Sequence, residues 1–220
     1  MNKRYLKKLS LKNSEAKEIA ITSLVILICL ALFFLFPVKG FAQTATVIFV
    51  FFLLIPVLYI KFNLRRDFQD YGWQMGNWKK GVLWGILSLI ATLAAVYLLI
   101  FYTNFSKAYT VPFSANFFYF ALYEILLVGI YIFLYEMFFR GFIMFSFRKY
   151  LGILAPLLQF TVFALFLWAT GNFNWINALY LITAFTSGWI TYQSRSLLYA
   201  PIAAWLSIII ADAVIIHMYR

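Results

Sequence analysis

The sequence predicts an all-α protein, a polytopic integral membrane bundle of about seven transmembrane helices, and three observations lead to this fold class. Hydrophobic residues make up 65% of the 220 residues and charged residues only 11%, whereas about a quarter of a soluble globular chain is charged. The apolar residues fall in runs near the ~20 positions that a spanning helix needs. Basic residues alternate in number between the segments that separate these runs. This pattern excludes a soluble domain, a disordered chain and a collagen-like chain.

Seven apolar runs of spanning length follow one another along the chain. They cover roughly residues 19–36, 43–60, 81–102, 115–139, 151–169, 175–193 and 197–217. None has the strand-like alternation of a membrane β-barrel, so each is expected to be a helix. The runs divide the chain into a basic cytoplasmic tail (1–18), a transmembrane hairpin (19–62), an amphipathic cytoplasmic loop (63–80) and a helical core (81–220).

The distribution of lysine and arginine predicts the orientation of these helices. Of the 18 basic residues, 15 fall on one side of the predicted bundle and 3 on the other. Because basic loops remain cytoplasmic, the amino terminus is expected inside and Arg220 outside, in a prokaryotic plasma membrane. The net charge of +11 then needs no nucleic acid to explain it, since a juxtamembrane basic cluster anchors the first helix and contacts anionic lipid of the bilayer.

The first apolar run has an alternative interpretation as the core of a cleaved signal peptide. Pro37 followed by Gly40, Phe41 and Ala42 resembles a helix break before a small-residue cleavage site. The run is 18 residues long, which exceeds the ~7–15 apolar residues of a signal sequence. A retained helix is therefore the favoured interpretation.

Acidic residues inside the predicted spans are the candidate functional residues, because charge in hydrocarbon is costly and commonly marks a site or an internal pair. There are three, Glu124, Glu136 and Asp212. Glu124 and Glu136 are 12 positions apart on one predicted helix, so they differ in direction by about 120° and need not share a site. The single cysteine, Cys29, excludes an intrachain disulfide and a cysteine-based metal site. No cofactor and no metal are expected.

Glu136 has a partner within its own helix. Arg140 follows it by four positions, which places the two side chains on one helix face in the favoured order, acid first. The spacing predicts an ion pair that neutralises both charges at the cytoplasmic edge and fixes helix packing. Gly141 comes next and would allow the helix to end or to approach a neighbour closely.

These residues also carry a resemblance to a family. The chain resembles the CAAX-protease and bacteriocin-processing (CPBP, or Abi) intramembrane peptidases, whose first motif is Glu-Glu-x-x-x-Arg, and here Tyr135, Glu136 and Arg140 stand at those positions. The resemblance covers roughly residues 70–220. It also rests on Asn77 to Gly81, on Asn172 to Trp175, on Phe185 and Gly188, and on Ser196 to Trp205. It implies the helical fold of that family, with Glu136 and Arg140 as remnants of its catalytic motif.

The departures from the family pattern imply lost catalysis. The first glutamate of the pair is Tyr135, and the second-motif histidine would fall near Leu167 or Trp168. The histidine and asparagine of the third motif are replaced by Trp205 and Ile209. Tyrosine, with a pKa near 10, is a poor general base at neutral pH. Trp168 and Trp205 are expected to fill the former site with apolar bulk.

Two further polar residues in the last span are assigned no chemistry. His217 is the only histidine and is expected at the membrane interface, because a catalytic zinc would need three protein ligands. Ser207 is expected to mediate helix packing.

Three functions fit this sequence. The first is a catalytically degenerate member of the family that acts by binding a membrane protein or lipid, such as a prenylated or peptide ligand. The second is an active intramembrane endopeptidase that uses Glu136 as general base, with its carboxyl pKa raised by burial. The third is a small ion or proton transporter built on the three intramembrane acids. The oligomeric state does not follow from the sequence.

Overall fold

The computed structural model describes residues 3–36, 40–103, 105–109, 111–112 and 116–219, with the side chains of 3–14, 106–107, 218 and 219 left aside. The described part of the chain is helical and contains no strand. This confirms the all-α class. Pro37 of the alternative cleavage site and the terminal Arg220 lie outside the described residues.

The amino-terminal third forms a helical hairpin. One long helix is followed by a second rod in which α-helical and π-helical turns alternate without a break. These elements are α1 (Lys3–Leu35), α2 (Phe41–Ile48), η1 (Phe49–Leu54), α3 (Ile55–Leu58) and η2 (Tyr59–Asn63).

The remaining elements run from the loop after this hairpin to the end of the described chain. A short 3₁₀ turn lies in the loop before the core, and two more join its later helices. In chain order the elements are η3 (Phe68–Tyr71), α4 (Trp78–Tyr102), α5 (Phe105–Ala108), α6 (Phe117–Leu122), η4 (Tyr123–Val128), α7 (Gly129–Glu136), η5 (Met137–Met144), α8 (Phe145–Leu151), η6 (Gly152–Leu154), α9 (Ala155–Ala169), η7 (Trp175–Asn177), α10 (Ala178–Ser194) and α11 (Tyr199–Tyr219).

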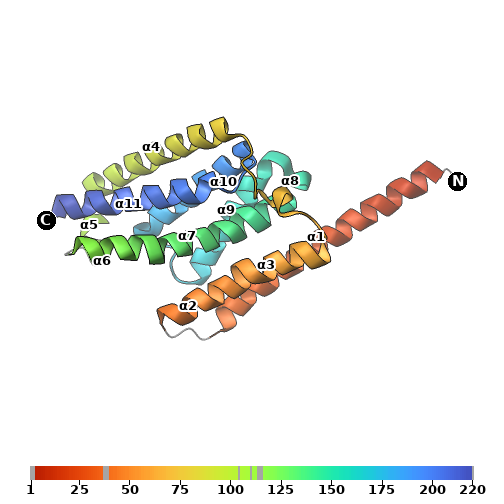
Figure 1. The fold of residues 1–220 in the computed structure, drawn as a ribbon, viewed down its shortest axis with the longest axis horizontal. Coiled ribbons are helices and arrows are strands. Elements are labelled where there is room, and N and C mark those ends of the chain that lie inside the picture. Colours follow the sequence, from red (N-terminus) through yellow and green to blue (C-terminus); the bar gives the residue numbers. More distant parts are fainter. Residues whose placement is uncertain (1–2, 37–39, 104, 110, 113–115, 220) are drawn as a thin grey trace.

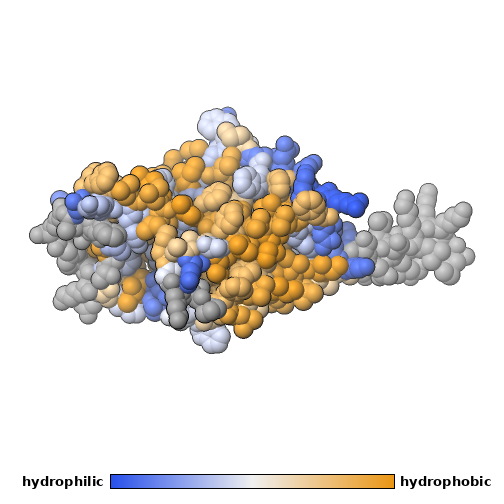
Figure 2. All heavy atoms as spheres, turned by 60° about the horizontal axis from the view of Figure 1, so that its bottom comes forward, coloured by the Kyte–Doolittle hydropathy of each residue, from blue (hydrophilic) through white to orange (hydrophobic). Residues whose placement is uncertain are grey.

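Five helical stretches in the described residues are long and apolar enough to cross a membrane. They are Glu15–Leu35, Phe41–Asn63, Trp78–Tyr102, Phe117–Ala169 and Tyr199–His217. The fourth contains 53 residues, more than twice what one crossing needs, and α10 adds an apolar helix of 17 residues. Figure 2 shows a broad apolar surface over the middle of the molecule and a large group of hydrophilic side chains on its right-hand side, toward the protruding end of α1.

The long fourth stretch reverses direction. Gly152 follows the last residue of α8 and begins the short turn η6. Its φ of +54° is a backbone conformation that glycine adopts at little cost. After this turn α9 packs back against η5, as two antiparallel neighbours do. The stretch is therefore a helical hairpin, although its hydrogen bonding is nearly continuous.

The helices lie alongside one another with the chain running back and forth between two ends (Figure 1). α4, α10 and α11 contact each other, α11 also contacts α7, and α9 lies between η5 and α10. The amino-terminal hairpin packs on α7 and η5 through α2 and η1. In Figure 1 the loop before α4 and helix α8 lie at one end of the bundle, while the beginnings of α2 and α6 lie at the other.

Aromatic rings fill the contact between the hairpin and the core. Phe52 of η1 stacks on Phe138 of η5 with ring centroids 4.4 Å apart, and both side chains are completely buried. Phe139 meets Phe163 of α9 edge to face at 5.0 Å. Such pairs add to the free energy of burial, so these rings stabilise the contact between the hairpin and the core.

Helix α1 includes the basic tail, because it runs from Lys3 through residue 18 without interruption. Of the two alternatives for Gly141, the helix does not end there, since the π-helical segment η5 carries it onward to α8. The close approach at Gly141 is confirmed: a Cβ there would lie 3.0 Å from Cδ2 of Leu197.

The loop 64–77 is fixed to the turn between α10 and α11. The amide of Asn77 donates to the carbonyl of Ser194 at 2.7 Å, and the amide of Leu197 donates to the carbonyl of Gly72 at 2.8 Å. Gly76 has a φ of +53°, and a Cβ there would overlap the carbonyl oxygen of Ser194. Two distant parts of the sequence thus form one structural unit at this end of the bundle.

Candidate functional site

The ion pair predicted from the i, i+4 spacing is present in the centre of the bundle. Nε of Arg140 lies 3.4 Å from Oε2 of Glu136, and the two side chains are 2% and 5% exposed. These two atoms form no hydrogen bond within the described part of the chain. The guanidinium also lies over the Phe163 ring, 5.4 Å from its centroid. Charge and ring contact therefore hold Arg140 in place.

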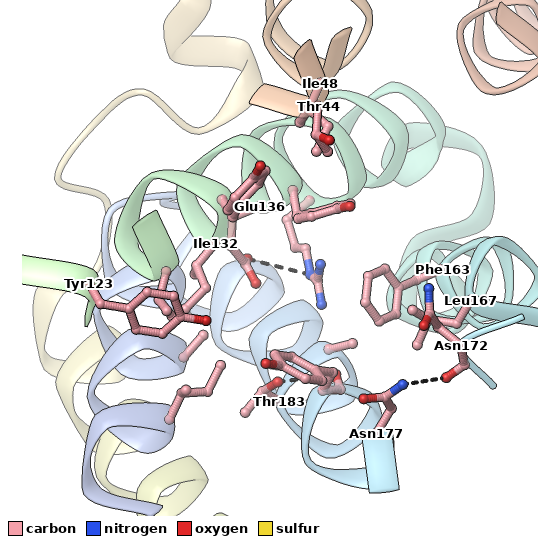
Figure 3. A pocket seen from close by; sticks show the side chains of 18 residues that line it. Thr44, Ile48, Tyr123, Ile132, Glu136, Phe163, Leu167, Asn172, Asn177 and Thr183 are labelled. Carbon is pink, nitrogen blue, oxygen red and sulfur yellow. Dashed lines mark hydrogen bonds and ion pairs between the residues drawn. The ribbon is translucent and has the colours of Figure 1, made fainter. Parts of the chain in front are cut away.

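A cavity of about 380 Å³ adjoins this pair. Its wall is formed by α2, the continuous helical rod from η4 to η5, α9, α10, α11 and the loop before α10. Figure 3 shows Glu136 pointing toward this space, with Phe163 and Leu167 on one side and Ile132 and Tyr123 on the other. The ion pair is thus at the wall of a ligand-sized space, in the lower part of the ~300–1,000 Å³ range of ligand pockets.

The lining combines apolar surface with neutral polar groups. Four tyrosines reach the cavity, and two threonines and two asparagines add hydroxyl and amide groups. These residues are Tyr123, Tyr131, Tyr135, Tyr180, Thr44, Thr183, Asn172 and Asn177. Such a wall suits an amphipathic ligand, because a few polar groups among apolar ones fix its orientation.

The two asparagines form the rim of the cavity at the end of the bundle opposite the loop 64–77 (Figures 1 and 3). Nδ2 of Asn177 donates to the carbonyl of Asn172 at 2.9 Å. The side chain of Asn174 accepts from the amide of Asn177 at 3.0 Å and begins η7. This loop is therefore ordered by its own amide groups, and it carries part of the Asn172 to Trp175 stretch of the family resemblance.

The structure separates the two candidate positions for the second-motif histidine. Leu167 lines the cavity, whereas Trp168 is 70% exposed and does not. The expectation that Trp168 fills the former site is wrong, because one step along a helix turns the side chain by about 100°. An imidazole at position 167 would face the cavity that Glu136 faces.

Trp205 does not fill the cavity either. Its indole Nε1 donates to the backbone carbonyl of Glu124 at 2.9 Å, so the ring joins α11 to η4. The cavity is bordered instead by Ala204 and Ile208 on the same helix. Ile209, which the family resemblance aligned with the third motif, is only partly buried and does not line the cavity. The space around the ion pair is consequently open, not plugged.

Glu124 and Asp212 form a second acidic group apart from the ion pair. Both side chains are buried, 2% and 3% exposed, and they are close enough to interact electrostatically. Within the described residues no basic side chain forms an ion pair with either. The sequence correctly separated Glu124 from Glu136, but it did not indicate that Asp212 would lie beside Glu124.

Tyr109, in the segment between α5 and α6, completes this acidic group. Its hydroxyl donates to Oδ1 of Asp212 at 2.9 Å. Burial raises the pKa of Tyr109, and the neighbouring Tyr180 and Asp212 add to the effect. Tyr109 therefore remains a hydrogen-bond donor at physiological pH and links the connection between α4 and α6 to α11.

The other polar residues of the last span have packing or surface positions. The hydroxyl of Ser207 donates to the carbonyl of Ala203 one turn earlier at 2.7 Å and is buried. His217 is exposed near the end of α11 and does not line the cavity. Among the described residues no three histidine, cysteine, aspartate or glutamate side chains come together as a metal site.

Sequence reasoning missed most of the cavity wall. Tyr123, Tyr131 and Tyr135 lie on one continuous helical rod, and their spacings of 8 and 4 keep them within about 120° of each other. That periodicity could have identified a tyrosine-lined face. The contributions of Asn177 and Thr183 depend on how α10 packs against the rod, which has no local signal.

Comparisons of the chain with models of known protein families, with curated proteins and with solved structures found no match.

Proposed function

We propose that this protein is a degenerate relative of the CAAX-type intramembrane peptidases, and that it acts by binding a membrane protein or lipid in the cavity beside Glu136 and Arg140. The observation that carries the proposal is the composition of the cavity wall. Tyrosine, asparagine and threonine side chains surround a buried acid and base. The only histidine lies outside the cavity.

The proposal includes the topology of the family. Seven crossings follow if the 117–169 stretch counts as a hairpin and α10 as a crossing. The loop 64–77 and α8 then lie in the cytoplasm, and the amino terminus is cytoplasmic in a prokaryotic plasma membrane, because these segments carry most of the basic residues. The asparagine rim of the cavity would face the outer side. A ligand segment would then enter from that side or from the outer leaflet.

One observation favours the alternative of an active endopeptidase. Among the described residues Oε2 of Glu136 has no hydrogen-bond partner of good geometry, and it lies next to a cavity large enough to hold water. A carboxylate with a free lone pair beside water is the geometry that general-base catalysis needs. Neither an oxyanion-stabilising imidazole nor a second carboxylate accompanies it in the cavity wall, so the binding function remains the stronger proposal.

Photo-crosslinking tests where the ligand binds. A photoreactive phenylalanine analogue at Leu167 would point into the cavity, and the same analogue at Trp168 provides a matched control one residue away that faces outward. With a labelled prenylated CAAX peptide, or with a labelled phospholipid, we expect saturable crosslinking from position 167 and little from position 168. Equal yields at both positions would contradict binding in the cavity.

A cleavage assay separates binding from catalysis. The purified protein is incubated with prenylated CAAX peptides and with membrane-embedded peptide substrates, and the products are analysed by mass spectrometry. We expect no cleavage. Turnover that is abolished by Glu136→Gln would establish the peptidase alternative instead.

A further inference from the structure

A second cavity, of about 580 Å³, lies at the end of the bundle that carries the loop 64–77. Three segments far apart in the sequence form it. They are the loop with Arg66, Gln69, Asp70 and Gln74, helix α8 with Phe145, Arg148 and Lys149, and the turn after α10 with Arg195. None of these residues lines the central cavity.

The hydrogen bonds between the loop and the α10–α11 turn hold this pocket in shape. Besides the two backbone bonds at Ser194 and Gly72, Nε2 of Gln74 donates to the carbonyl of Arg195 at 3.3 Å. Arg195 has a left-handed backbone with φ +57°, which is uncommon for a residue with a side chain. The pocket is therefore preformed by the fold.

Four basic side chains and one acidic side chain line the pocket. Every one of the seven acidic residues of the chain lies in the described part, so their partners can be assigned. Arg66 is neutralised by Glu18, whose carboxylate accepts from Nη2 at 2.7 and 2.8 Å. Lys149 lies 3.8 Å from Glu15 and 3.9 Å from Glu18.

The remaining acids leave Arg148 and Arg195 without a carboxylate partner. Asp67 lies 3.6 Å from Lys61, and Glu124, Glu136 and Asp212 are in the core. Among the described residues no ion pair involves Arg148 or Arg195. Asp70 is thus the only acidic group in the pocket wall.

Arg148 and Arg195 are close enough to repel each other. Arg148 is held in place all the same: Nη2 donates to the carbonyl of Tyr192 at 3.1 Å, and the guanidinium lies over the Tyr192 ring at 4.9 Å. A guanidinium has five N–H donors, so most of those on Arg148 are free to face the pocket. Two neighbouring guanidinium groups without a carboxylate partner give the pocket a positive potential that favours a bound anion.

The apolar surface beside the pocket indicates which class of anion would bind there. Acyl chains could follow the exposed apolar side chains at the same end of the bundle, such as Trp73 and Leu198, each 41% exposed. Arginine forks match phosphate oxygens, and basic pockets between helices on the cytoplasmic side bind anionic lipid headgroups. We propose that this pocket binds the phosphate of an anionic phospholipid of the cytoplasmic leaflet between Arg148 and Arg195. This inference does not depend on the function of the central cavity.

The test uses the full chain purified in mild detergent, with phosphatidylglycerol as the probe. Titration followed by native mass spectrometry or thermal unfolding measures its affinity. We expect saturable binding that is about tenfold weaker in Arg148→Gln and in Arg195→Gln, because each variant removes a charge-assisted hydrogen bond. Lys79→Gln is the matched control: it removes an exposed charge near the same end of the bundle, outside the pocket wall, and should bind like the parent.

One further variant and two further ligands test the proposal if an arginine variant fails to fold. Asp70→Asn removes the only acid from the pocket wall and should strengthen binding of phosphatidylglycerol. Phosphatidylcholine should bind far more weakly, and inorganic phosphate alone should not reproduce the stabilisation. Binding that is unchanged in Asp70→Asn and equal for the two lipids would overturn the proposal. If inorganic phosphate alone stabilises the protein as much as phosphatidylglycerol does, the pocket binds free phosphate and not a lipid headgroup.

Discussion

Arg140 and Glu136 face each other across one helical turn, with 3.4 Å between Nε and Oε2, and almost no part of either side chain is exposed. The pair forms one wall of the central cavity. Because both side chains are buried, each charge depends mainly on the other for compensation.

Removal of one partner of this pair is expected to destabilise the protein strongly. Arg140→Ala leaves the Glu136 carboxylate buried and unpaired, which commonly costs about 3–5 kcal/mol. We expect a marked fall in the melting temperature in detergent and in the yield of folded protein. Lys149→Ala, which removes an exposed charge, should change stability by less than about 1 kcal/mol.

The double variant Glu136→Gln, Arg140→Met tests whether charge compensation is the cause. It removes both charges and retains side-chain volume, so it should recover most of the stability lost in Arg140→Ala. If the double variant is as unstable as the single one, the arginine contributes through packing on Phe163 and not through the ion pair.

Trp205 links α11 to η4 through one hydrogen bond, and this predicts a modest effect of substitution. Trp205→Phe keeps an aromatic ring but leaves the carbonyl of Glu124 without its indole donor. The expected cost is about 1 kcal/mol, measured by thermal unfolding. Trp168→Phe is the control, because that side chain is 70% exposed, and it should have no measurable effect in detergent.

Both tryptophan variants should leave ligand binding in the central cavity unchanged, since neither ring lines it. A loss of crosslinking from position 167 in Trp168→Phe would show that the exposed tryptophan contacts the ligand.

Asp212 is expected to act as an acceptor for Tyr109 more than as a charge. Asp212→Asn keeps an oxygen for the Tyr109 hydroxyl and removes one of two adjacent acidic groups, so stability should change by less than about 0.5 kcal/mol. Asp212→Leu removes the acceptor and should cost about 1–3 kcal/mol. Thermal unfolding of both variants in the same detergent gives the comparison.

Tyr109→Phe completes the double-mutant cycle. Added to Asp212→Leu, it should cost nothing further, because the hydrogen bond is already absent. An additional loss as large as in the parent would mean that the Tyr109 hydroxyl depends on another partner.

The sequence was sufficient for the helical class, for the long apolar helices and for the pairing of Glu136 with Arg140. These follow from composition, run length and a four-residue spacing within one helix. All are local properties, or properties that the membrane imposes on any spanning segment.

The predictions that were wrong or missing concern the packing between helices. The choice between Leu167 and Trp168 as the cavity-facing residue is a matter of helix rotation, and a helix that is apolar on all sides contains no amphipathic signal to fix it. Asp212 lies beside Glu124 only because α11 packs on the rod that contains α7. Neither result could be read from a single segment of the chain.

Gly76 provides the last prediction, because it lies where the loop 64–77 meets the α10–α11 turn. Its φ of +53° disfavours any side chain, and an added Cβ would overlap the carbonyl oxygen of Ser194. Gly76→Ala should therefore cost more than the ~1–2 kcal/mol of a left-handed backbone alone. Gly171→Ala is the matched control, since Gly171 has φ +72° and open space around its Cβ position, so it bears only the backbone cost. Thermal unfolding should give Gly76→Ala a clearly lower melting temperature than Gly171→Ala.

Binding of phosphatidylglycerol should weaken only in Gly76→Ala, because the displaced loop carries one wall of the basic pocket. Equal stability and equal lipid binding of the two variants would mean that the loop and the turn are not held together as the hydrogen bonds at Ser194 and Gly72 indicate.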